Sequence, residues 1–306
     1  MAMGTVMSHK VYGLFAEECL DAIQYEIEHL ENLFSRFIPS SEIRLINQNA
    51  GLKPIPVSFE TYEVLSAANE LSSRCGSVFD ITINPLVHLW TTTLRNNQIP
   101  SVDNISKTMR LVNFRDLVLD PVERTAFLQQ PGQAIDLGGI GKGYASKKIL
   151  EIFATFGIHC AYSNLGGNVI SIGEKLDGSP WRIGIQHPRN EKDLVGCISI
   201  RDQVVVTAGD YQRYVIGLDG KRYHHILNPV SGYPAQSGLI SVTIVSRDAI
   251  VADVLSTAIL IAGEEKGLEI IAGFPGTEAI LVNQSQEILI TQGLKDFQSN
   301  ERFIVV

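Results

Sequence analysis

The spacing of apolar and polar positions predicts helices in the first half of the chain. From residue 16 to 37, apolar side chains recur at steps of three and four with Glu and Asn between them, as in an amphipathic helix. A second helix is expected from an N-cap at Ser58 to a stop at Gly76, and a third over 141–156. Residues 84–131, with prolines at 85, 100, 121 and 131, give mixed short patterns that define no element.

Strand patterns dominate the second half of the chain. Single strands are predicted at 161–173, 181–186, 197–207 and 240–246. Two hairpins are predicted, with arms at 211–217 and 221–227 around Leu218-Asp219-Gly220, and with arms at 279–282 and 287–291. An apolar run at 249–262 predicts a further helix. Helices early and a strand meander late, without regular βαβ alternation, favour an α+β fold.

Composition narrows the class of protein. The 306 residues are 45% hydrophobic and 19% charged, which is ordinary for a globular protein with a large core. The formal net charge of −8 argues against nucleic acid as a partner, because nucleic-acid-binding surfaces gather Lys and Arg. A polyanionic ligand would need local neutralisation, which a metal ion could supply.

The cysteines and the N-terminus add little chemistry. The four cysteines are far apart, with no CxxC or CxxH spacing, so burial as small apolar residues is expected rather than a zinc or redox site. The chain contains no run of about 18 apolar residues, so no membrane-spanning helix is predicted. Residues 1–10 fit either a natural start or the remainder after loss of an export signal.

A glycine-rich segment runs from Asp136 to Gly143 and contains four glycines and Lys142. Such a loop lets backbone groups approach a ligand, and the helix that starts beyond it favours phosphate. The GxxxxGK[ST] spacing of a Walker loop is absent, since Tyr144 follows Gly143. Phosphate binding and a tight turn into a helix both remain open.

The apolar helix at 249–262 carries a carboxylate. Asp253 and Thr257 lie one turn apart on the same face, with Ser256 beside them. A buried carboxylate is costly unless it is paired, hydrogen-bonded or bound to a metal, and Mg²⁺ prefers such oxygen ligands. A capping or salt-bridged aspartate is the alternative.

Two adjacent histidines end a predicted strand. Because side chains alternate along a strand, His224 and His225 face opposite ways, so at most one enters a given site. That histidine could act as a general base or could be structural. Two further polar, glycine-containing turns, at 164–168 and 207–211, favour a shared ligand pocket.

Taken in order, these segments resemble the flavin transferases of the ApbE type, the FAD:protein FMN transferases. The matching segments are Met3-Gly4-Thr5, Phe34-Ser35-Arg36-Phe37 with Ser41-Glu42 and Asn47, Phe79-Asp80-Ile81-Thr82 with Pro85-Leu86-Val87 and Leu89-Trp90, Asp136 to Gly143, Thr207 to Asp210, His224 to Pro229 with Gly232, and Ala252-Asp253 with Thr257-Ala258. They span nearly the whole chain, and seven motifs in the family's order make chance similarity implausible.

The resemblance implies one compact, ApbE-like and T-fold-related α+β domain over residues 1–306, with helices packed on an antiparallel sheet. It implies Mg²⁺ held by the carbonyl of Gly139 and the side chains of Asp253 and Thr257, with Ser256 close by. It makes His225 the candidate base, with Asp253 the second catalytic residue. The FAD contacts it implies are Met3, Phe37, the Val78-Phe79-Asp80 strand, Asp136, Lys142 and Leu227.

The implied reaction is attack by a Thr or Ser hydroxyl of an acceptor protein on FAD, which releases AMP. Acceptors of the family carry an Asp-Gly-x-Thr/Ser-x-x-Thr type motif, and this chain has no such run, so the acceptor is expected to be another polypeptide. An FAD pyrophosphatase and a non-catalytic FAD-binding protein are the alternatives. Sequence does not identify the oligomeric state.

Three departures from the family pattern are visible. Phe37 stands where tyrosine is frequent, Gly141 replaces a usual alanine and Ala208 replaces a usual serine. A hydroxyl contact is therefore lost at Phe37 and at Ala208. Family members are bacterial and commonly exported, many as lipoproteins. This chain shows neither an export signal nor a lipid-bearing cysteine, which leaves a cytoplasmic and an exported location open.

Overall fold

The computed structural model describes residues 3–96, 98–217 and 219–306. Contacts between Cα atoms divide the chain into two compact units. The first unit holds the described residues of 1–29, 142–211 and 237–306, and the second unit those of 30–141 and 212–236. Helix α1 (Ala16–Phe34) runs across the boundary after residue 29. The expectation of a single domain over 1–306 stays a prediction.

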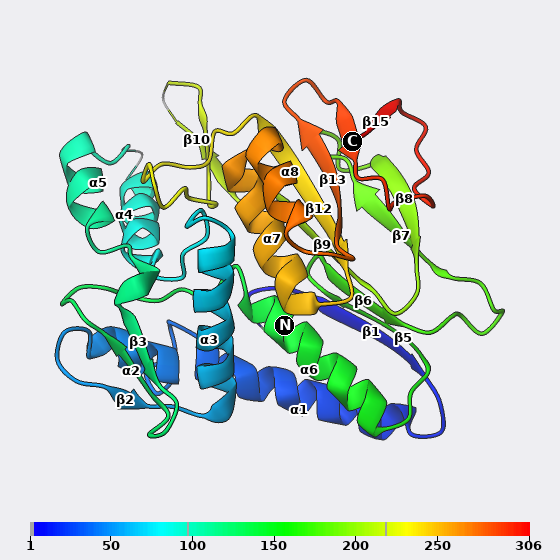
Figure 1. Cartoon of the computed structure of the whole chain (residues 1–306), viewed down its shortest axis with the longest axis horizontal. Coiled ribbons are helices and arrows are strands. Elements are labelled where there is room, and N and C mark those ends of the chain that lie inside the picture. The colour runs from blue at the N-terminus through cyan, green and yellow to red at the C-terminus, as the bar shows by residue number, and fades with distance from the viewer. Residues whose placement is uncertain (1–2, 97, 218) are drawn as a thin grey trace. The chain divides into compact units, whose positions relative to one another are not determined.

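The first unit is built on an eight-stranded sheet (Figure 1). Its strands, in spatial order, are β1 (Met7–Tyr12), β5 (Cys160–Leu165), β6 (Asn168–Ile172), β9 (Val204–Gly209), β12 (Leu239–Ser246), β13 (Glu278–Asn283), β14 (Ile288–Ile290) and β15 (Phe303–Val305). Every neighbouring pair is antiparallel except β14 and β15. The expected antiparallel sheet is therefore confirmed, with one parallel pair at its edge.

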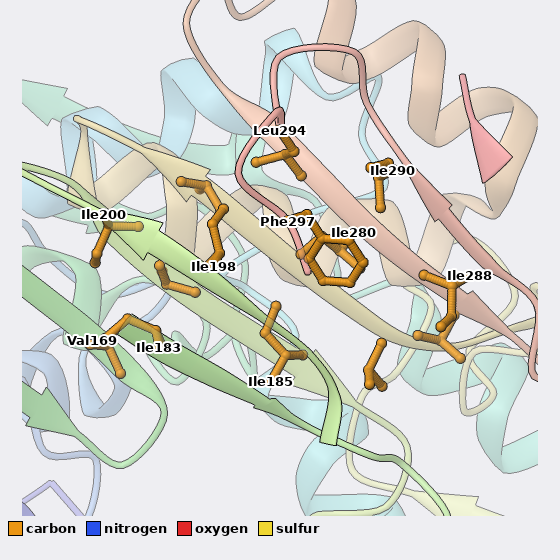
Figure 2. Close-up of a cluster of buried hydrophobic side chains, with 14 of the residues drawn as sticks. Val169, Ile183, Ile185, Ile198, Ile200, Ile280, Ile288, Ile290, Leu294 and Phe297 are labelled. Carbon is orange, nitrogen blue, oxygen red and sulfur yellow. The ribbon is translucent and has the colours of Figure 1, made fainter. Parts of the chain in front are cut away.

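Different layers cover the two faces of this sheet. Helix α7 (Ala249–Ala262) packs on β9 and β12, and α8 (Glu264–Ala272) follows it and contacts β13. A hairpin of β7 (Trp181–Gln186) and β8 (Leu194–Ile200) joins a separate apolar cluster with alternate residues of the sheet, including Val205 and Val245. Figure 2 shows part of this cluster, with Ile183, Ile198 and Ile280 among its labelled side chains. Because neighbouring side chains of a strand point to opposite faces, this cluster lies on the face away from α7. This unit also contains α6 (Gly141–Thr155) from residue 142 onward and residues 16–29 of α1.

The second unit combines short helices with two small sheets. Its helices are α2 (Glu42–Gln48), α3 (Phe59–Arg74), α4 (Asn84–Arg95), α5 (Val102–Met109) and the 3-10 turn η1 (Phe114–Asp116). Its sheets are β2 (Ile55–Pro56), β4 (Thr125–Leu128) and β3 (Leu117–Asp120) in that order, and the hairpin of β10 (Tyr214–Ile216) and β11 (Arg222–His224). Trp90 anchors one core cluster here: its Nε1 donates to the carbonyl of Gly232 at 2.8 Å, and its ring stacks on Tyr223 at 5.4 Å.

The helix predictions hold closely. Helix α3 begins after Ser58, whose hydroxyl accepts the N–H of Thr61, and α7 covers its predicted range. Helix α1 ends three residues early, at Phe34, because the hydroxyl of Ser35 accepts the N–H groups of Phe37 and Ile38 and turns the chain. The α+β class is confirmed.

Two strand predictions in the second half of the chain were wrong. The single strand at 161–173 is two strands, since Gly166 and Gly167 adopt positive φ of 62° and 103° and reverse the chain. The single strand at 197–207 is likewise divided between β8 and β9. The segment 84–131, for which the sequence defined no element, contains α4, α5, η1, β3 and β4, with Pro85 in the first turn of α4, where its missing N–H costs nothing.

Other expectations are met in part. The hairpin around Leu218-Asp219-Gly220 forms with shorter arms than expected, and Leu218 lies outside the described residues. All four cysteines are free thiols; Cys19 and Cys75 are buried as expected, whereas Cys160 and Cys197 are half-buried. Within the described residues, no helix has the length and apolar character needed to cross a membrane.

Candidate functional site

In the second unit, Asp136 is fixed at the start of the glycine-rich segment. Its Oδ1 accepts the N–H of Gly138 at 2.8 Å, and its Oδ2 lies 3.1 Å from Nε of Arg36. The same guanidinium donates to Oδ1 of Asn84 at 2.7 Å. Sequence reasoning did not assign Arg36 or Asn84 a role, although both lie in or beside the quoted motifs. The arrangement compensates the charge of Asp136 and holds the loop that leads towards Gly139.

Phe37 presents its ring to solvent. The side chain is 78% exposed, and the guanidinium carbon of Arg36 lies 4.5 Å from the ring centroid. A large exposed aromatic ring that stacks on a cation has little part in the core. Phe37 is therefore available to a planar ligand.

The segment Val78-Phe79-Asp80 is not a strand, contrary to expectation, and its side chains point into the core. Asp80 accepts the N–H and hydroxyl of Thr82 with one oxygen, at 2.7 and 2.6 Å, and the N–H of Phe114 with the other, at 2.9 Å. Burial raises the pKa of the Asp80 carboxyl, and these hydrogen bonds oppose the shift. The carboxylate braces the loop, which leaves the backbone as the part of this segment that could meet a ligand.

The two histidines have different environments, as the alternation predicted. His224 is 7% exposed; its Nδ1 accepts the N–H of Ile226 at 3.3 Å, and its Nε2 donates to the carbonyl of Ala235 at 2.9 Å. His225 is exposed, and its Nδ1 donates to the carbonyl of Arg213 at 3.2 Å. In the neutral ring this contact leaves the basic lone pair on Nε2. Leu227, two residues on, is 6% exposed and belongs to the core cluster of Trp90.

In the first unit, Asp253 is a buried carboxylate at the N-terminal turn of α6. The residue is 4% exposed, and its Oδ2 accepts the N–H of Gly143 at 2.7 Å. Helix α7 has its own N-cap, Asp248, so Asp253 does not cap its own helix. Instead it satisfies a donor of α6 that has no partner within that helix.

The approach of α6 to Asp253 requires glycine at position 143. A Cβ there would lie 2.6 Å from the carbonyl oxygen of Ala249 and 2.7 Å from Cβ of Asp253. We expect Gly143→Ala to lower the free energy of unfolding by about 1–3 kcal/mol, because the two helices must separate. Gly141→Ala is the matched control: its Cβ would meet nothing closer than 3.7 Å, so stability should stay or rise by up to about 1 kcal/mol. Urea denaturation measures both, and equal stabilities would contradict the close approach.

The surroundings of Asp253 fit a hard cation. Its Oδ1 makes no hydrogen bond, and no cationic side chain pairs with the carboxylate, within the part of the chain that the structure describes. Ser256 is 2% exposed and donates to the backbone carbonyl of Asp253 at 2.8 Å, which leaves its oxygen as an acceptor. Thr257 follows, half-buried. The described residues hold no group of three His, Cys, Asp or Glu side chains, so a metal here would rely on neutral oxygens besides one carboxylate.

Lys142 also lies in the first unit, beside the turn of β5 and β6. Its Nζ donates to Oδ1 of Asn168 at 3.0 Å, and Asn168 is fully buried. Thr5 fills the space beside Gly166 in that turn, where a Cβ would lie 1.9 Å from Oγ1 of Thr5. The segment that contains half-buried Met3 therefore reaches the turn next to Asn168.

The end of β9 is held by an ion pair that sequence reasoning missed. Arg189 donates to both carboxylate oxygens of Asp210, at 2.7 and 2.8 Å. Thr207 and Thr243 share a hydrogen bond of 2.8 Å across β9 and β12. No local spacing connects Arg189 with Asp210, so the sequence offered no more than an Asp in a glycine-containing turn as a signal.

The expected site residues fall into two groups. The first unit brings together Asp253, Ser256 and Thr257 of α7 with Gly143 and Lys142 of α6. Met3 also lies in the first unit, and the second unit carries the other candidates, which are Phe37, Val78, Phe79, Asp80, Asp136, Gly139, His225 and Leu227. Of these, Asp136 and Phe37 are joined through Arg36.

Comparison with known proteins gives consistent matches. The model of the ApbE family matches residues 3–281. An FAD:protein FMN transferase of Klebsiella pneumoniae is 34% identical over 94% of this chain and 89% of its own length, and one of Treponema pallidum is 28% identical over 97% and 86%. The crystal structure of the ApbE protein of Thermotoga maritima superposes with a TM-score of 0.88 at 31% identity, covering 96% of each chain. The ApbE-like fold is thus confirmed, and the chain belongs to the ApbE family.

Proposed function

We propose that this protein transfers FMN from FAD to a Thr or Ser hydroxyl of an acceptor protein, releases AMP and requires Mg²⁺. Membership of the ApbE family, with relatives named FAD:protein FMN transferase, makes the chain an enzyme of flavin transfer. The proposal adds the metal, the acceptor hydroxyl and the second product. The observation that carries it is the buried Asp253 carboxylate, which has one oxygen unused and two hydroxyl residues beside it.

The chain's own oxygens would hold the cation. We assign Mg²⁺ to the carboxylate of Asp253, the hydroxyls of Ser256 and Thr257, and the backbone carbonyl of Gly139, four positions before Gly143 in the chain. When bound, the ion supplies positive charge that offsets the charge developing on the pyrophosphate. Lys142 adds a fixed ammonium at the start of α6, where the helix N-terminus also favours phosphate.

The proposed FAD contacts combine apolar and polar groups. An exposed ring at Phe37 and the thioether of Met3 suit a planar heterocycle, and Asp136 offers an acceptor whose position Arg36 fixes. Val78, Phe79, Asp80 and Leu227 have buried side chains, so any contact from them would come through the backbone or the surface they shape. The full proposed set is Met3, Phe37, Val78, Phe79, Asp80, Asp136, Lys142 and Leu227.

In the proposed reaction, Nε2 of His225 accepts the proton of the acceptor hydroxyl. The hydroxyl oxygen forms a bond to the FMN-side phosphorus, the bond from that phosphorus to the bridging oxygen breaks, and AMP leaves with the electron pair. The Nδ1 contact with the Arg213 carbonyl keeps the ring oriented and Nε2 basic in the neutral form. The proton then passes from the imidazolium to solvent or to the leaving AMP.

Incubation with FAD, Mg²⁺ and an acceptor bearing an Asp-Gly-x-Thr/Ser-x-x-Thr type motif tests the proposal. We expect the acceptor to gain the mass of FMN less water, with one AMP released for each flavin attached. Because His225 is exposed, water could replace the hydroxyl and give free FMN and AMP, so a parallel reaction without acceptor measures the pyrophosphatase activity. If the acceptor mass is unchanged and FAD stays intact in both reactions, the proposed transfer and the pyrophosphatase activity are both refuted, and a non-catalytic FAD-binding protein remains.

Phe37→Ala should weaken FAD binding by about 1–3 kcal/mol if the ring stacks on flavin or adenine. Folding should be unaffected, because the ring is 78% exposed. Fluorescence titration gives the dissociation constant. Phe59→Ala is the control, since that ring is also exposed, at 55%, in the same unit. Equal affinities of the two variants would remove Phe37 from the site.

A further inference from the structure

Strand β10 presents an apolar edge to solvent. Its three residues, Tyr214, Val215 and Ile216, are 46%, 40% and 54% exposed. Within the described residues, β10 pairs only with β11. Proteins generally protect such edges with charge or proline, and an edge of three consecutive apolar β-formers is suited to pairing with another chain.

The register of the hairpin shows which backbone groups the edge offers. The N–H of His225 donates to the carbonyl of Arg213 at 3.1 Å, and the N–H of Gly217 donates to the carbonyl of Lys221 at 2.9 Å. Hydrogen-bonded pairs alternate along an antiparallel ladder, so residues 213, 215 and 217 direct their backbone groups towards β11. Tyr214 and Ile216 therefore direct their N–H and C=O groups to the open side.

The hairpin is positively charged in an acidic protein. Residues 212–225 contain Arg213, Lys221 and Arg222 against Asp219, a net charge of +2, whereas the whole chain has a formal net charge of −8. The Arg222 guanidinium also covers the ring of Tyr214 at 4.1 Å, which places a cation over the apolar strand. An acidic segment with apolar side chains complements this combination.

We propose that an extended, acidic segment of the acceptor protein adds to β10 as a further strand. This inference rests on the proposed function, because it supplies the means by which a protein substrate is held. The candidate base lies on the same hairpin: the carbonyl of Arg213, immediately before β10, accepts from both the backbone N–H and the ring Nδ1 of His225. The hairpin that carries His225 therefore also fixes where the acceptor segment lies relative to this candidate base.

Ile216→Pro tests the backbone pairing. Proline removes the N–H that Ile216 directs to the open side. The two bonds at the ends of the hairpin ladder stay intact, because in them the carbonyl of Arg213 accepts the N–H of His225 and the N–H of Gly217 donates to the carbonyl of Lys221. We expect KM for a motif-bearing acceptor peptide to rise about tenfold, with kcat at saturating peptide and acceptor-free FAD cleavage unchanged. Ile216→Ala is the matched control, because it shortens the side chain but keeps the N–H.

Lys221→Glu tests the charge independently and does not disturb the strand backbone. It should raise KM for an acidic peptide and leave KM unchanged for the same peptide with its flanking Asp and Glu replaced by Gln. FAD affinity and melting temperature report folding for every variant. If Ile216→Pro fails to fold, the Lys221→Glu comparison decides. If the folded variants have the same KM for the acidic peptide as the parent enzyme, the proposed docking of the acceptor on β10 is wrong. If the parent enzyme itself never labels the acceptor, the proposed function is refuted.

Discussion

Asp253→Asn is expected to abolish most FAD turnover, by about 100-fold or more at moderate Mg²⁺. The amide can still accept the N–H of Gly143, so the packing of α6 on α7 should persist, but the negative charge that the cation needs is lost. Even outer partners of metal ligands are worth roughly 10–100-fold, and a direct ligand should exceed that. The rate of AMP release as a function of Mg²⁺ measures the effect, and excess Mg²⁺ should restore part of it.

Asp248→Asn is the control for this experiment. The Asp248→Asn substitution removes the same charge from the N-cap of the same helix. The amide oxygen of asparagine can replace Oδ1 of Asp248, which accepts the N–H groups of Ile250 and Val251. Its Mg²⁺ dependence should match the parent. The metal assignment fails if Asp253→Asn keeps the parent's Mg²⁺ dependence, or if AMP forms at an undiminished rate with EDTA present.

His225→Ala is expected to slow transfer by about 10²–10⁴-fold while FAD and metal binding stay nearly intact. The ring is exposed and contributes little to the core, so the loss should be confined to proton removal. Raising the pH should recover part of the rate, because hydroxide can replace the missing base. AMP release, measured with FAD affinity across a pH series, distinguishes the base from a group that merely shapes the pocket.

His224→Ala provides the contrast within the same dipeptide. Both of its ring nitrogens are engaged in the interior, so this variant should lower the melting temperature. A His225→Ala protein that transfers FMN at the parent rate would exclude His225 as the base. One that loses FAD affinity would give it a binding role instead.

Local patterns predicted the elements that a single stretch of sequence determines. Helices α6 and α7 were predicted almost to the residue, because their apolar runs and end signals are contiguous. A glycine-containing turn was predicted at 164–168, but a single strand was also predicted through it, because apolar residues continue on both sides; the positive φ values of Gly166 and Gly167 show that the chain reverses there. Helix α4 was not predicted because the patterns of 84–131 are mixed and contain prolines, although a proline such as Pro85 is compatible with the first turn of a helix.

In the candidate site, too, features set by one stretch of sequence were predicted, whereas contacts between distant stretches were not. Apolar neighbours on one helix were enough to predict that Asp253 is buried, and alternation was enough to separate His224 from His225. The partner of each charged group was not predictable. Arg36 and Asp136 are a hundred positions apart, and Asp253 meets a backbone N–H rather than a side chain. Such pairs depend on the fold, which no local spacing encodes.

The contact between Asp253 and Gly143 also bears on how stable the protein is without the proposed metal. A buried carboxylate whose negative charge is not compensated would move to solvent or bind a proton. Here the positive end of the α6 dipole and the N–H donated by Gly143 offset the charge of Asp253. We therefore expect EDTA to leave the melting temperature unchanged, unlike that of small domains that unfold when their metal is removed. If Mg²⁺ binds as proposed, Asp253 would keep its position when the ion leaves.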